Sequence, residues 1–566
     1  MKQRYLDLME QAVDAYTDEH IASYTREVRE NGLREHGYPR LTANIGILLA
    51  HGRHPERRDI FADMMELCCR EILVARARTD AAGNDFSVKE IVFCIEEVEK
   101  AGLFDRTVTD GWRNILAQID PYAVYTCIAA HPPERISNWA AFGAASEQTR
   151  LAAGIGNERD FIENQVLSQI LSFDENGMYR DPNEPMVYDF VTRLQLAVCL
   201  TEGYDGAGKD ELEEAFDRSA LPTLLMQSVS GEIPFGGRSN QFLHNETFYA
   251  ALCEWYAVRY AQRGNTELAG QFRSAARLAA DSLSRWLTAE EVHHIKNRYP
   301  PDSRMGCEGY GYFDKYMVTM GSWAYLAYRW ANLLPADDSI PEVPCPAQTG
   351  GYVWETGEHF HKMFASCGGY FLEFEKNADP HYDACGLGRI HRRGVPGELC
   401  LSVPFAVHPN YTIGENNPRA LSLCSSLERN GVRQYGADVP YRTSFTEASP
   451  EKVTVTLENE LGLTETYEIT ENGISIRVHG GAGTAYELPV FAFDGAEFTE
   501  IAVSENRREL TVTHRGFRCR YTTDGMFEDV GETVRNRNGE YRHYRVSGTG
   551  DTVCVSVMLE RLNFCK

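Results

Sequence analysis

The chain has 566 residues, 43% of them hydrophobic and 24% charged, a globular composition that excludes extended disorder and predicts about two to four domains. Its formal net charge of −26 excludes binding to nucleic acid or to an anionic membrane, because both need a basic surface. An anionic small ligand is not excluded, since a few arginines in a cleft can reverse the local potential.

The N-terminal segment, residues 1–20, spreads its charges through an amphipathic pattern and has no apolar core of the kind a signal peptide needs. No segment reaches the roughly 20 consecutive apolar residues of a membrane-spanning helix. The 15 cysteines are scattered and form no CxxC motif, which is typical of reduced thiols in a protein core. We therefore expect a cytoplasmic protein.

Apolar residues recur at spacings of three and four from the N-terminus to about residue 335, the pattern of helices that bury one face. We count about twelve such segments, using typical helix and loop lengths. Examples are 56–77, 87–102, 157–173 and 268–287. The segment 320–334 is apolar on more than one face, which is expected for the inner ring of a two-layer arrangement.

From about residue 345 the apolar period changes to two, in short runs separated by Gly, Asn or Asp. Turn-sized gaps between strands imply antiparallel pairing and hence a β-sandwich. The predicted architecture is therefore an α+β multidomain protein: an (α/α)6 toroid in 1–335, a proline-rich linker in 336–350, and an antiparallel β-sandwich in 351–566. Proteins of this layout are very often hydrolases or uronate-specific lyases, although fold alone does not give function.

Four polar, aromatic loops interrupt the helical half, and each ends where a helix is predicted to begin. They are 135–151, 173–191, 231–248 and 297–323. In a toroid alternate helices run the same way, so their N-terminal ends converge on one face. Free N–H groups and partial positive charge at helix N-termini favour an anionic ligand there. A uronic acid is the expected substrate class.

The first two loops supply amide, aromatic and acidic side chains. Asn138 and Trp139 stand at a helix start as substrate-binding candidates, although Asn138 could simply cap the helix while Trp139 fills the core. The second loop is longer than packing requires, and its Asp181 and Asp189 are a candidate acid and base. Asp189 could instead be the N-cap of the next helix. The remaining candidates of this loop are Tyr179, Arg180 and Tyr188.

The third and fourth loops add an arginine, a histidine and several tyrosines. Arg238 can hold a carboxylate through two parallel hydrogen bonds, and His244 and Glu246 follow as rival candidates for the chemistry. Tyrosines beside glycines suit sugar binding, because flat rings stack on pyranose faces. The further substrate-binding candidates are Ser239, Asn240, Arg304, Glu308, Tyr310 and Tyr312.

Four stretches within residues 130–330 resemble, in order and spacing, the DUF2264 proteins. They are NWAAFGAASEQTRLAAGIGN, DENGMYRDPNEPMVYDF, GEIPFGGRSNQ and GYGYFDKYMVTMGSWAY. That family includes glycoside hydrolase family 154, so the resemblance implies an exo-acting β-glucuronidase. Two departures are present: Met178 and Pro182 replace the family's usual Trp and Gly, and residues 240–246 replace a Tyr-Arg pair.

Hydrolysis is the chemistry that this resemblance favours. A glycoside hydrolase needs two carboxyl groups that flank the scissile bond. Asp181 and Glu246 are the best pair in this chain, with Asp189 and Glu308 as substitutes.

A lyase is the alternative, because the toroid-plus-sandwich layout also resembles polysaccharide lyases of the hyaluronate and heparinase type. Those enzymes use an Asn to neutralise the uronate carboxylate and a His or Tyr to remove the C5 proton. Asn138, His244 and Tyr188 are the matching candidates here, with Tyr249 or Tyr310 as alternatives. A non-catalytic carbohydrate-binding protein is a third hypothesis.

The β half is predicted to be less involved in the chemistry. Segment 381–400, which includes His391, could reach the cleft and contact substrate. His359 and His361, with His381 and Asp383, leave a structural zinc site open as an alternative, but we expect no metal and no other cofactor. The expected partner is a uronate-containing oligosaccharide, with no nucleic acid and no membrane, and a homo-oligomer is left open.

Overall fold

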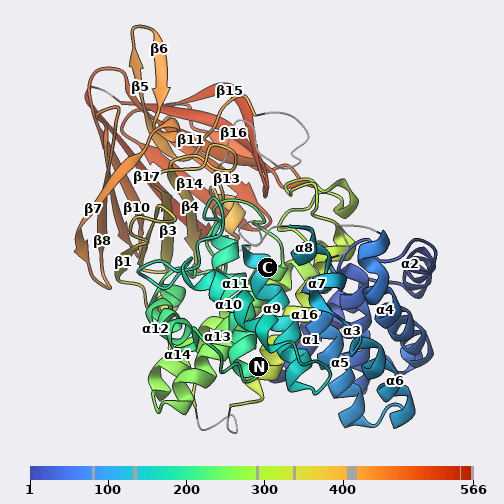
Figure 1. Cartoon of the computed structure of the whole chain (residues 1–566). Helices are drawn as coiled ribbons and strands as arrows, with labels where there is room; N and C mark the ends of the chain where they lie inside the picture. The colour runs from blue at the N-terminus through green and yellow to red at the C-terminus, as the bar shows by residue number, and fades with distance from the viewer. Residues whose placement is uncertain are drawn as a thin grey trace.

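A helical half and a β half lie against each other in the computed structural model (Figure 1). The structure describes residues 1–78, 83–131, 137–288, 292–334, 340–404, 417–548 and 550–562. The last long helix ends at Ala331 and the first strand begins at Tyr352. Residue 335 at the end of the predicted toroid, 336–339 of the predicted linker, and 135–136 at the start of the first predicted loop lie outside the described residues.

The helical half consists of helices α1 to α16, and α17 follows it before the first strand. Their bounds are α1 (Lys2–Asp14), α2 (Asp18–Asn31), α3 (Gly37–Ala50), α4 (Arg58–Arg78), α5 (Val88–Ala101), α6 (Arg106–Leu116), α7 (Pro121–Val124), α8 (Thr126–Ala130), α9 (Asn138–Ala152), α10 (Arg159–Ile170), α11 (Met186–Thr201), α12 (Lys209–Leu225), α13 (His244–Gln262), α14 (Thr266–Ser282), α15 (Ser284–Leu287), α16 (Phe313–Ala331) and α17 (Pro346–Thr349).

Six of these helices form a closed inner ring, in which α3, α5, α9, α11, α13 and α16 each pack against the next and α16 returns to α3. Helices α4, α6, α10, α12 and α14 follow the inner helices in the chain and form the outer layer with the N-terminal helices. Inner helices are more completely buried than outer ones, as the distribution of apolar residues in the sequence predicts. Helix α13 is buried along nearly all of its length, whereas outer helix α6 buries only Thr109, Trp112 and Leu116.

The β half contains seventeen strands in the described part of the chain. They are β1 (Tyr352–Glu355), β2 (Lys362–Cys367), β3 (Tyr370–Glu375), β4 (Gly386–Arg392), β5 (Cys424–Arg429), β6 (Val432–Tyr435), β7 (Tyr441–Ala448), β8 (Val453–Asn459), β9 (Thr464–Thr470), β10 (Gly473–His479), β11 (Thr484–Phe493), β12 (Glu500–Val503), β13 (Glu509–His514), β14 (Phe517–Thr523), β15 (Met526–Asn536), β16 (Gly539–Ser547) and β17 (Thr552–Arg561).

These strands form three antiparallel sheets. The first is β1-β2-β3-β4, the second β12-β13-β14-β17-β10-β9-β8-β7, and the third β15-β16-β11-β5-β6. Burial alternates along strands with one solvent face, as in β10, where Ile474, Ile476 and Val478 point into the core. The predicted toroid followed by an antiparallel sandwich is thereby confirmed.

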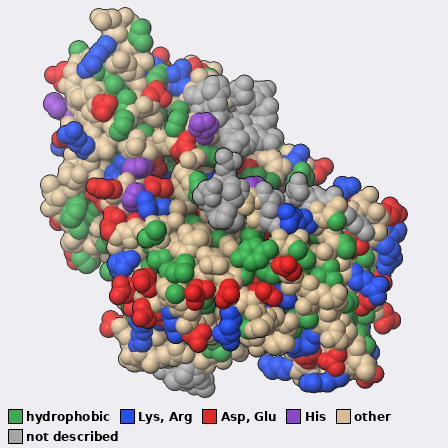
Figure 2. Space-filling view, in the orientation of Figure 1, with side chains coloured by type: hydrophobic (Ala, Val, Ile, Leu, Met, Phe, Trp, Pro, Cys, Tyr) green, Lys and Arg blue, Asp and Glu red, His purple; other side chains and the backbone are tan. Residues whose placement is uncertain are grey.

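Acidic and basic side chains are interspersed over the helical half on the face drawn in Figure 2, and its described residues form no extended basic surface there. No helix in the described ranges is long and apolar enough to cross a membrane.

Candidate active site

A cavity of about 390 Å³ lies where the six inner helices begin, within the size range of about 300–1,000 Å³ that is usual for ligand pockets. Every inner helix, or the loop before it, contributes to the lining, so the helix N-termini converge as the loop positions predicted. The lining residues are His36, Arg40, Gly83, Phe86, Cys127, His131, Asn138, Trp139, Phe142, Val187, Tyr188, Val191, Ser239, His244, Phe248, Tyr310, Lys315, Tyr316, Thr319 and Trp323. No Asp or Glu is among these described residues. We call this space the central cavity.

Six of the residues predicted from sequence line the central cavity. They are Asn138, Trp139, Tyr188, Ser239, His244 and Tyr310. They come from all four predicted loops, which are separated by up to about 170 residues in the chain.

Three hydroxyl groups form a hydrogen-bonded row along the wall. The Tyr188 hydroxyl lies 3.1 Å from the Ser239 Oγ, which lies 2.7 Å from the Tyr310 hydroxyl. Burial raises the pKa of Tyr310, and the neighbouring Tyr188 and Glu308 act in the same direction. Tyr310 is therefore neutral at neutral pH, and the row can pass a proton between its ends.

The His244 imidazole packs against two aromatic rings, with its centroid 5.3 Å from that of Phe242 and 4.8 Å from that of Tyr316. Burial lowers its pKa well below the usual value, and Arg40, His294 and Lys296 lower it further. Its Nδ1 has no hydrogen-bond partner among the described residues. His244 is therefore a neutral base at the cavity wall.

Asn138 is fixed by an acid that lies behind the wall. Its side-chain amide donates to Asp181 Oδ1 at 2.8 Å, and its backbone N–H donates to the same oxygen at 3.2 Å. Since a carboxamide has two N–H donors, one remains for a ligand. Asn138 is the first residue of α9 and Ser137 is the N-cap, so the side chain of Asn138 does not cap the helix.

Arg238, predicted as the clamp for a substrate carboxylate, is bound to a carboxylate of the chain itself. Its guanidinium donates to Asp181 Oδ2 and, at 2.9 Å, to the Pro182 carbonyl. It also lies over the Tyr188 ring, 4.1 Å from the centroid. Neither Arg238 nor Asp181 belongs to the cavity lining.

Asp189 forms a fully buried ion pair with Arg193 at 2.6 Å. It also accepts a hydrogen bond from the Tyr179 backbone N–H at 2.7 Å. It is not an N-cap, because α11 begins at Met186. The Tyr179 hydroxyl donates to Gln169. Arg180 donates to the Leu171 carbonyl at 3.2 Å. These three predicted residues lie away from the central cavity.

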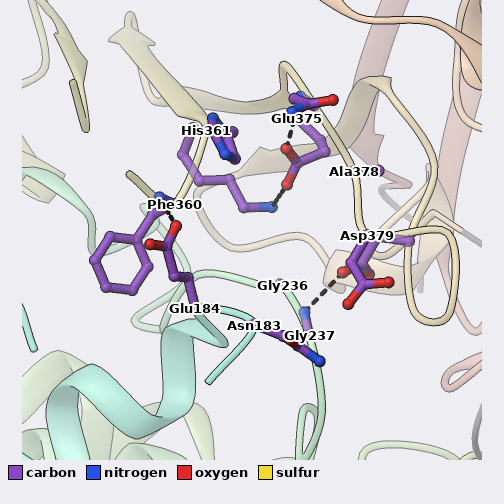
Figure 3. Close-up of a pocket in the computed structure, with 12 residues that line it drawn as sticks. Asn183, Glu184, Gly236, Gly237, Phe360, His361, Glu375, Ala378 and Asp379 are labelled. Carbon is purple, nitrogen blue, oxygen red and sulfur yellow. Dashed lines mark hydrogen bonds and ion pairs between the residues drawn. The ribbon is translucent and has the colours of Figure 1, made fainter. Parts of the chain in front are cut away.

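A second cavity, of about 330 Å³, lies between the helical and β halves (Figure 3). Its lining includes Glu184, His361 and Asp383, from both halves of the chain. Burial raises the pKa of Asp383 to about 6, and Asp383 Oδ2 accepts the Gly237 N–H at 2.7 Å. This cavity therefore lies behind the loop that carries Arg238.

The zinc site considered from sequence has no counterpart among the described residues. His359 contacts Glu184 at 2.7 Å, and His381 contacts Asp379 at 3.1 Å. The one group of three potential ligands that the described residues bring within 4.8 Å is Asp494, Glu497 and His514. Arg515 contacts both of those carboxylates.

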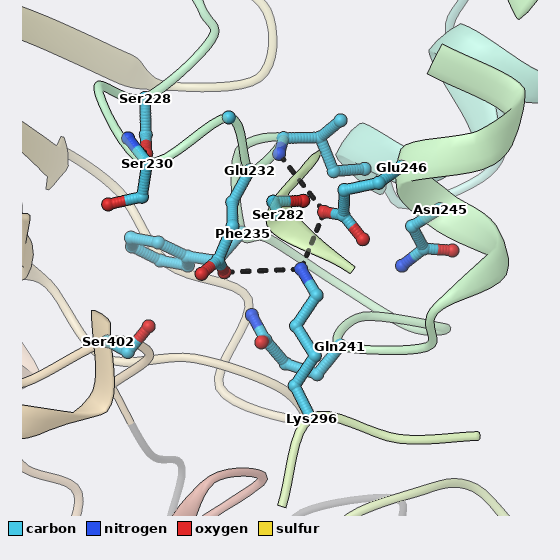
Figure 4. A network of polar contacts seen from close by, with 12 residues as sticks. Ser228, Ser230, Glu232, Phe235, Gln241, Asn245, Glu246, Ser282, Lys296 and Ser402 are labelled. Atoms are coloured by element: carbon cyan, nitrogen blue, oxygen red, sulfur yellow. Dashed lines mark hydrogen bonds and ion pairs between the residues drawn. The ribbon is translucent and has the colours of Figure 1, made fainter. Parts of the chain in front are cut away.

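Glu246 belongs to a buried ionic network rather than to the cavity lining (Figure 4). The Lys296 amine lies 2.5 Å from Glu246 and 3.1 Å from Glu232. Burial raises the pKa of Glu246, and Lys296 offsets this only in part. Burial also opposes ionisation of Glu232, yet Lys296, His391 and Arg389 lower its pKa. The structure therefore does not bring Asp181 and Glu246 together at the central cavity.

The remaining predicted residues support the cavity or lie beside it. Glu308 accepts the Ser239 N–H at 2.6 Å, and the Asn240 amide donates to the Gly237 carbonyl at 2.9 Å. Tyr312 lines a neighbouring cavity of about 640 Å³, which shares Tyr310 and Lys315 with the central one. Arg304 lies over the Tyr312 ring at 4.9 Å. His391 is buried between Ser228 and Ser402, so it does not reach the central cavity.

Sequence analysis missed His36 and Arg40. Arg40 contacts His36 Nδ1 at 2.6 Å and donates to Thr319 Oγ1 at 2.8 Å. It is a buried cation at the wall and also pairs with Glu90 at 3.4 Å. The stretch EHGYPRL, residues 35–41, leads into the strongly apolar helix α3 and includes its first turn, which is the same pattern that singled out the four loops. Lys315, in the fourth loop, adds a second cation 3.5 Å from Glu35.

No protein-family model and no curated protein sequence matches the chain, so the resemblance to DUF2264 proteins gains no support from either. The structure is similar to that of a heparan sulfate lyase HepC mutant from Pedobacter heparinus, with 8% identity, coverage of 93% of this chain and 76% of that one, and a TM-score of 0.44. Heparinase III is 7% identical, with coverage of 85% of this chain and 70% of that one, and a TM-score of 0.45. A GH127 β-L-arabinofuranosidase from Geobacillus stearothermophilus is 11% identical, with coverage of 98% of this chain and 96% of that one, and a TM-score of 0.34. At TM-scores below 0.5 this similarity carries no functional argument.

Proposed function

We propose that the chain is a lyase that cleaves uronate-containing oligosaccharides by β-elimination. The observation that supports this proposal is the composition of the central cavity. Its lining combines Asn138, Tyr188 and His244 with the cations Arg40 and Lys315, and no carboxylate is among the lining residues that the structure describes. A site with these groups suits an anionic substrate and proton transfer by His and Tyr.

The reaction would begin at the uronate carboxylate. The free N–H of Asn138, with Arg40 and Lys315, would neutralise the carboxylate and so stabilise the negative charge that develops when C5 loses its proton. His244 takes that proton, because its imidazole is neutral. The electron pair of the C5–H bond forms the C4–C5 double bond as the C4–O bond breaks.

The leaving oxygen needs a proton in the same step, and Tyr188 is the donor we assign. Its hydroxyl is joined to Ser239 and through it to Tyr310, so the row can return a proton to Tyr188. Arg238, which lies over the Tyr188 ring, stabilises the negative charge that develops on the phenol oxygen during the transfer.

Hydrolysis is less well supported. It needs two carboxyl groups that flank the scissile bond. Both acids of the predicted pair are instead in buried contacts, Asp181 with Arg238 and Glu246 with Lys296.

The two reactions differ in their products. We would incubate the purified chain with uronate-containing oligosaccharides, follow the absorbance of an unsaturated uronate, and weigh the products by mass spectrometry. A lyase gives rising absorbance and product masses that add up to the substrate mass. Hydrolysis adds one water to that sum without the absorbance change and would overturn the proposal. Asn138→Ala and His244→Gln should both remove the absorbance change.

A further inference from the structure

We propose that the β-sandwich takes part in building the central cavity, and that Arg537, at the tip of the β15–β16 hairpin, is a positioning residue for Ser239. The contacts stand on their own; the expected effect on turnover rests on the proposed lyase function. Arg537 and Asn538 form the turn between Asn536 and Gly539, which are paired across the two strands.

The Arg537 side chain reaches from the sandwich into the helical half and is fully buried there. Its Nη2 donates to the Gly237 carbonyl at 3.0 Å and lies 3.4 Å from Glu308 Oε1. The same Glu308 oxygen accepts the Ser239 N–H at 2.6 Å. Arg537 therefore fixes the acceptor that fixes Ser239.

Ser239 needs such support because of its backbone conformation. Its φ is +63°, a left-handed value that is unfavourable for a residue with a side chain. In this conformation its Oγ lies between the hydroxyls of Tyr188 and Tyr310. If the loop relaxed, the hydroxyl row along the cavity wall would be interrupted.

The sandwich holds Gly237 by both of its backbone polar groups. Arg537 donates to the Gly237 carbonyl, and Asp383, also from the β half, accepts its N–H at 2.7 Å. A residue held by both its N–H and its C=O has little freedom to move. Because Arg238 and Ser239 follow directly, the sandwich sets the direction in which this loop enters the cavity.

The hairpin tip is itself anchored in the helical half. Asn297 donates to the Arg537 carbonyl at 2.8 Å, and Asn538 donates to the Lys296 carbonyl at 2.9 Å. A Cβ at Gly306 would lie 2.6 Å from the Arg537 carbonyl oxygen, so the hairpin tip packs too closely on Gly306 for any side chain at that position. Buried ionic groups add little stability over well-packed apolar ones, which favours a role in register and position for this arginine.

The test compares Arg537→Lys with Arg542→Lys. Arg542 lies on β16 of the same hairpin, pairs with Asp529 of β15 at 2.6 Å and is half exposed, so it is a matched control whose ion pair lies within the sandwich. Arg537→Lys keeps the charge but loses the planar fork. We expect kcat to fall about 10- to 100-fold with little change in KM, and amide exchange of residues 236–242 to rise. Arg542→Lys should leave both unchanged.

The results distinguish a failure of the proposed lyase function from a failure of the positioning role of Arg537. If the native chain turns over no uronate substrate, the lyase function fails, and amide exchange alone tests the positioning role. If Arg537→Lys shows native exchange and native kcat, the positioning role is overturned. A lowered Tm with unchanged kcat and exchange would also overturn it, because Arg537 would then serve stability only. Should Arg537→Lys fail to fold, Glu308→Gln is expected to show the same exchange and kcat effects.

Discussion

Arg238 lies between the Asp181 carboxylate, with which it forms an ion pair, and the Tyr188 ring, over which it stacks. From its sequence context, after two glycines and before a run of polar residues, Arg238 was predicted to hold the carboxylate of a substrate. The carboxylate that it binds comes from residue 181 of the same chain, and sequence spacing could not show that. The pair places Asn138 as well, since Asp181 accepts from its amide.

Arg238→Ala should therefore affect stability as well as turnover. Asp181 is fully buried, and removal of its partner leaves a charge without compensation, which we expect to lower the free energy of unfolding by about 2–3 kcal/mol. Urea unfolding measures the loss. The double variant Arg238→Ala/Asp181→Ala should recover part of it; native stability in the single variant would contradict the ion-pair account.

The lowered pKa of His244 gives a prediction for pH dependence. A base must be neutral to accept the C5 proton, so activity should be present above the folded pKa and lost as pH falls through it. Because burial, Arg40, His294 and Lys296 all lower that pKa, we expect the acid limb of kcat/KM to lie well below pH 6.5. Arg40→Gln should move the limb upward. A rate that rises on acidification would exclude His244 as the base.

The six inner helices are the elements that build the site, because each one begins at the central cavity. This arrangement could be predicted from sequence, since polar loops before strongly apolar helices are visible as a pattern. The pairing of particular side chains could not. Glu246 and His244 lie two residues apart at the start of α13, yet one faces Lys296 and the other the cavity.

The loop before α13 depends on glycine at position 237. Its φ is +72°, and a Cβ there would lie 2.5 Å from the Pro185 Cβ, so Gly237→Ala combines backbone strain with a clash. We expect a loss of about 2–4 kcal/mol in unfolding free energy and lower turnover. Gly394→Ala is the control: its φ is +76° with no atom within 4 Å, so only the strain of about 1 kcal/mol should appear in thermal and urea unfolding.

At the scale of the whole molecule, the two halves are joined by buried polar contacts as well as by the linker. Asp494 in the β half contacts Arg298 in the helical half, and His514 and Arg515 lie at 3.1 Å from the same carboxylate oxygen. The change of period near residue 345 predicted both halves. The spacing of apolar residues in either half gives no information on contacts between residues about 200 positions apart, so the sequence did not predict this interface.

Asp494 should make stability depend on pH. Burial opposes its ionisation, but hydrogen bonds from His514 and backbone N–H groups, with Arg515, lower its pKa to about 2. A carboxyl group with a depressed pKa stabilises the fold above its unfolded pKa near 4, and this contribution is lost as pH falls toward 2. Asp494→Asn should cost about 1 kcal/mol at pH 7 after allowance for solvent screening. By pH 3 the difference in urea unfolding should narrow; a constant difference would contradict the assignment.

The contacts that Arg537 and Asp383 make with Gly237 have a consequence for how such a chain can change. A sandwich that holds a loop of the toroid by hydrogen bonds is not an interchangeable module, because a chimera joined at the linker would bring a foreign hairpin to this loop. Recombination between related chains would then succeed only when the hairpin tip and the loop at 231–243 are inherited together. The two segments lie about 300 residues apart and would form one unit of exchange.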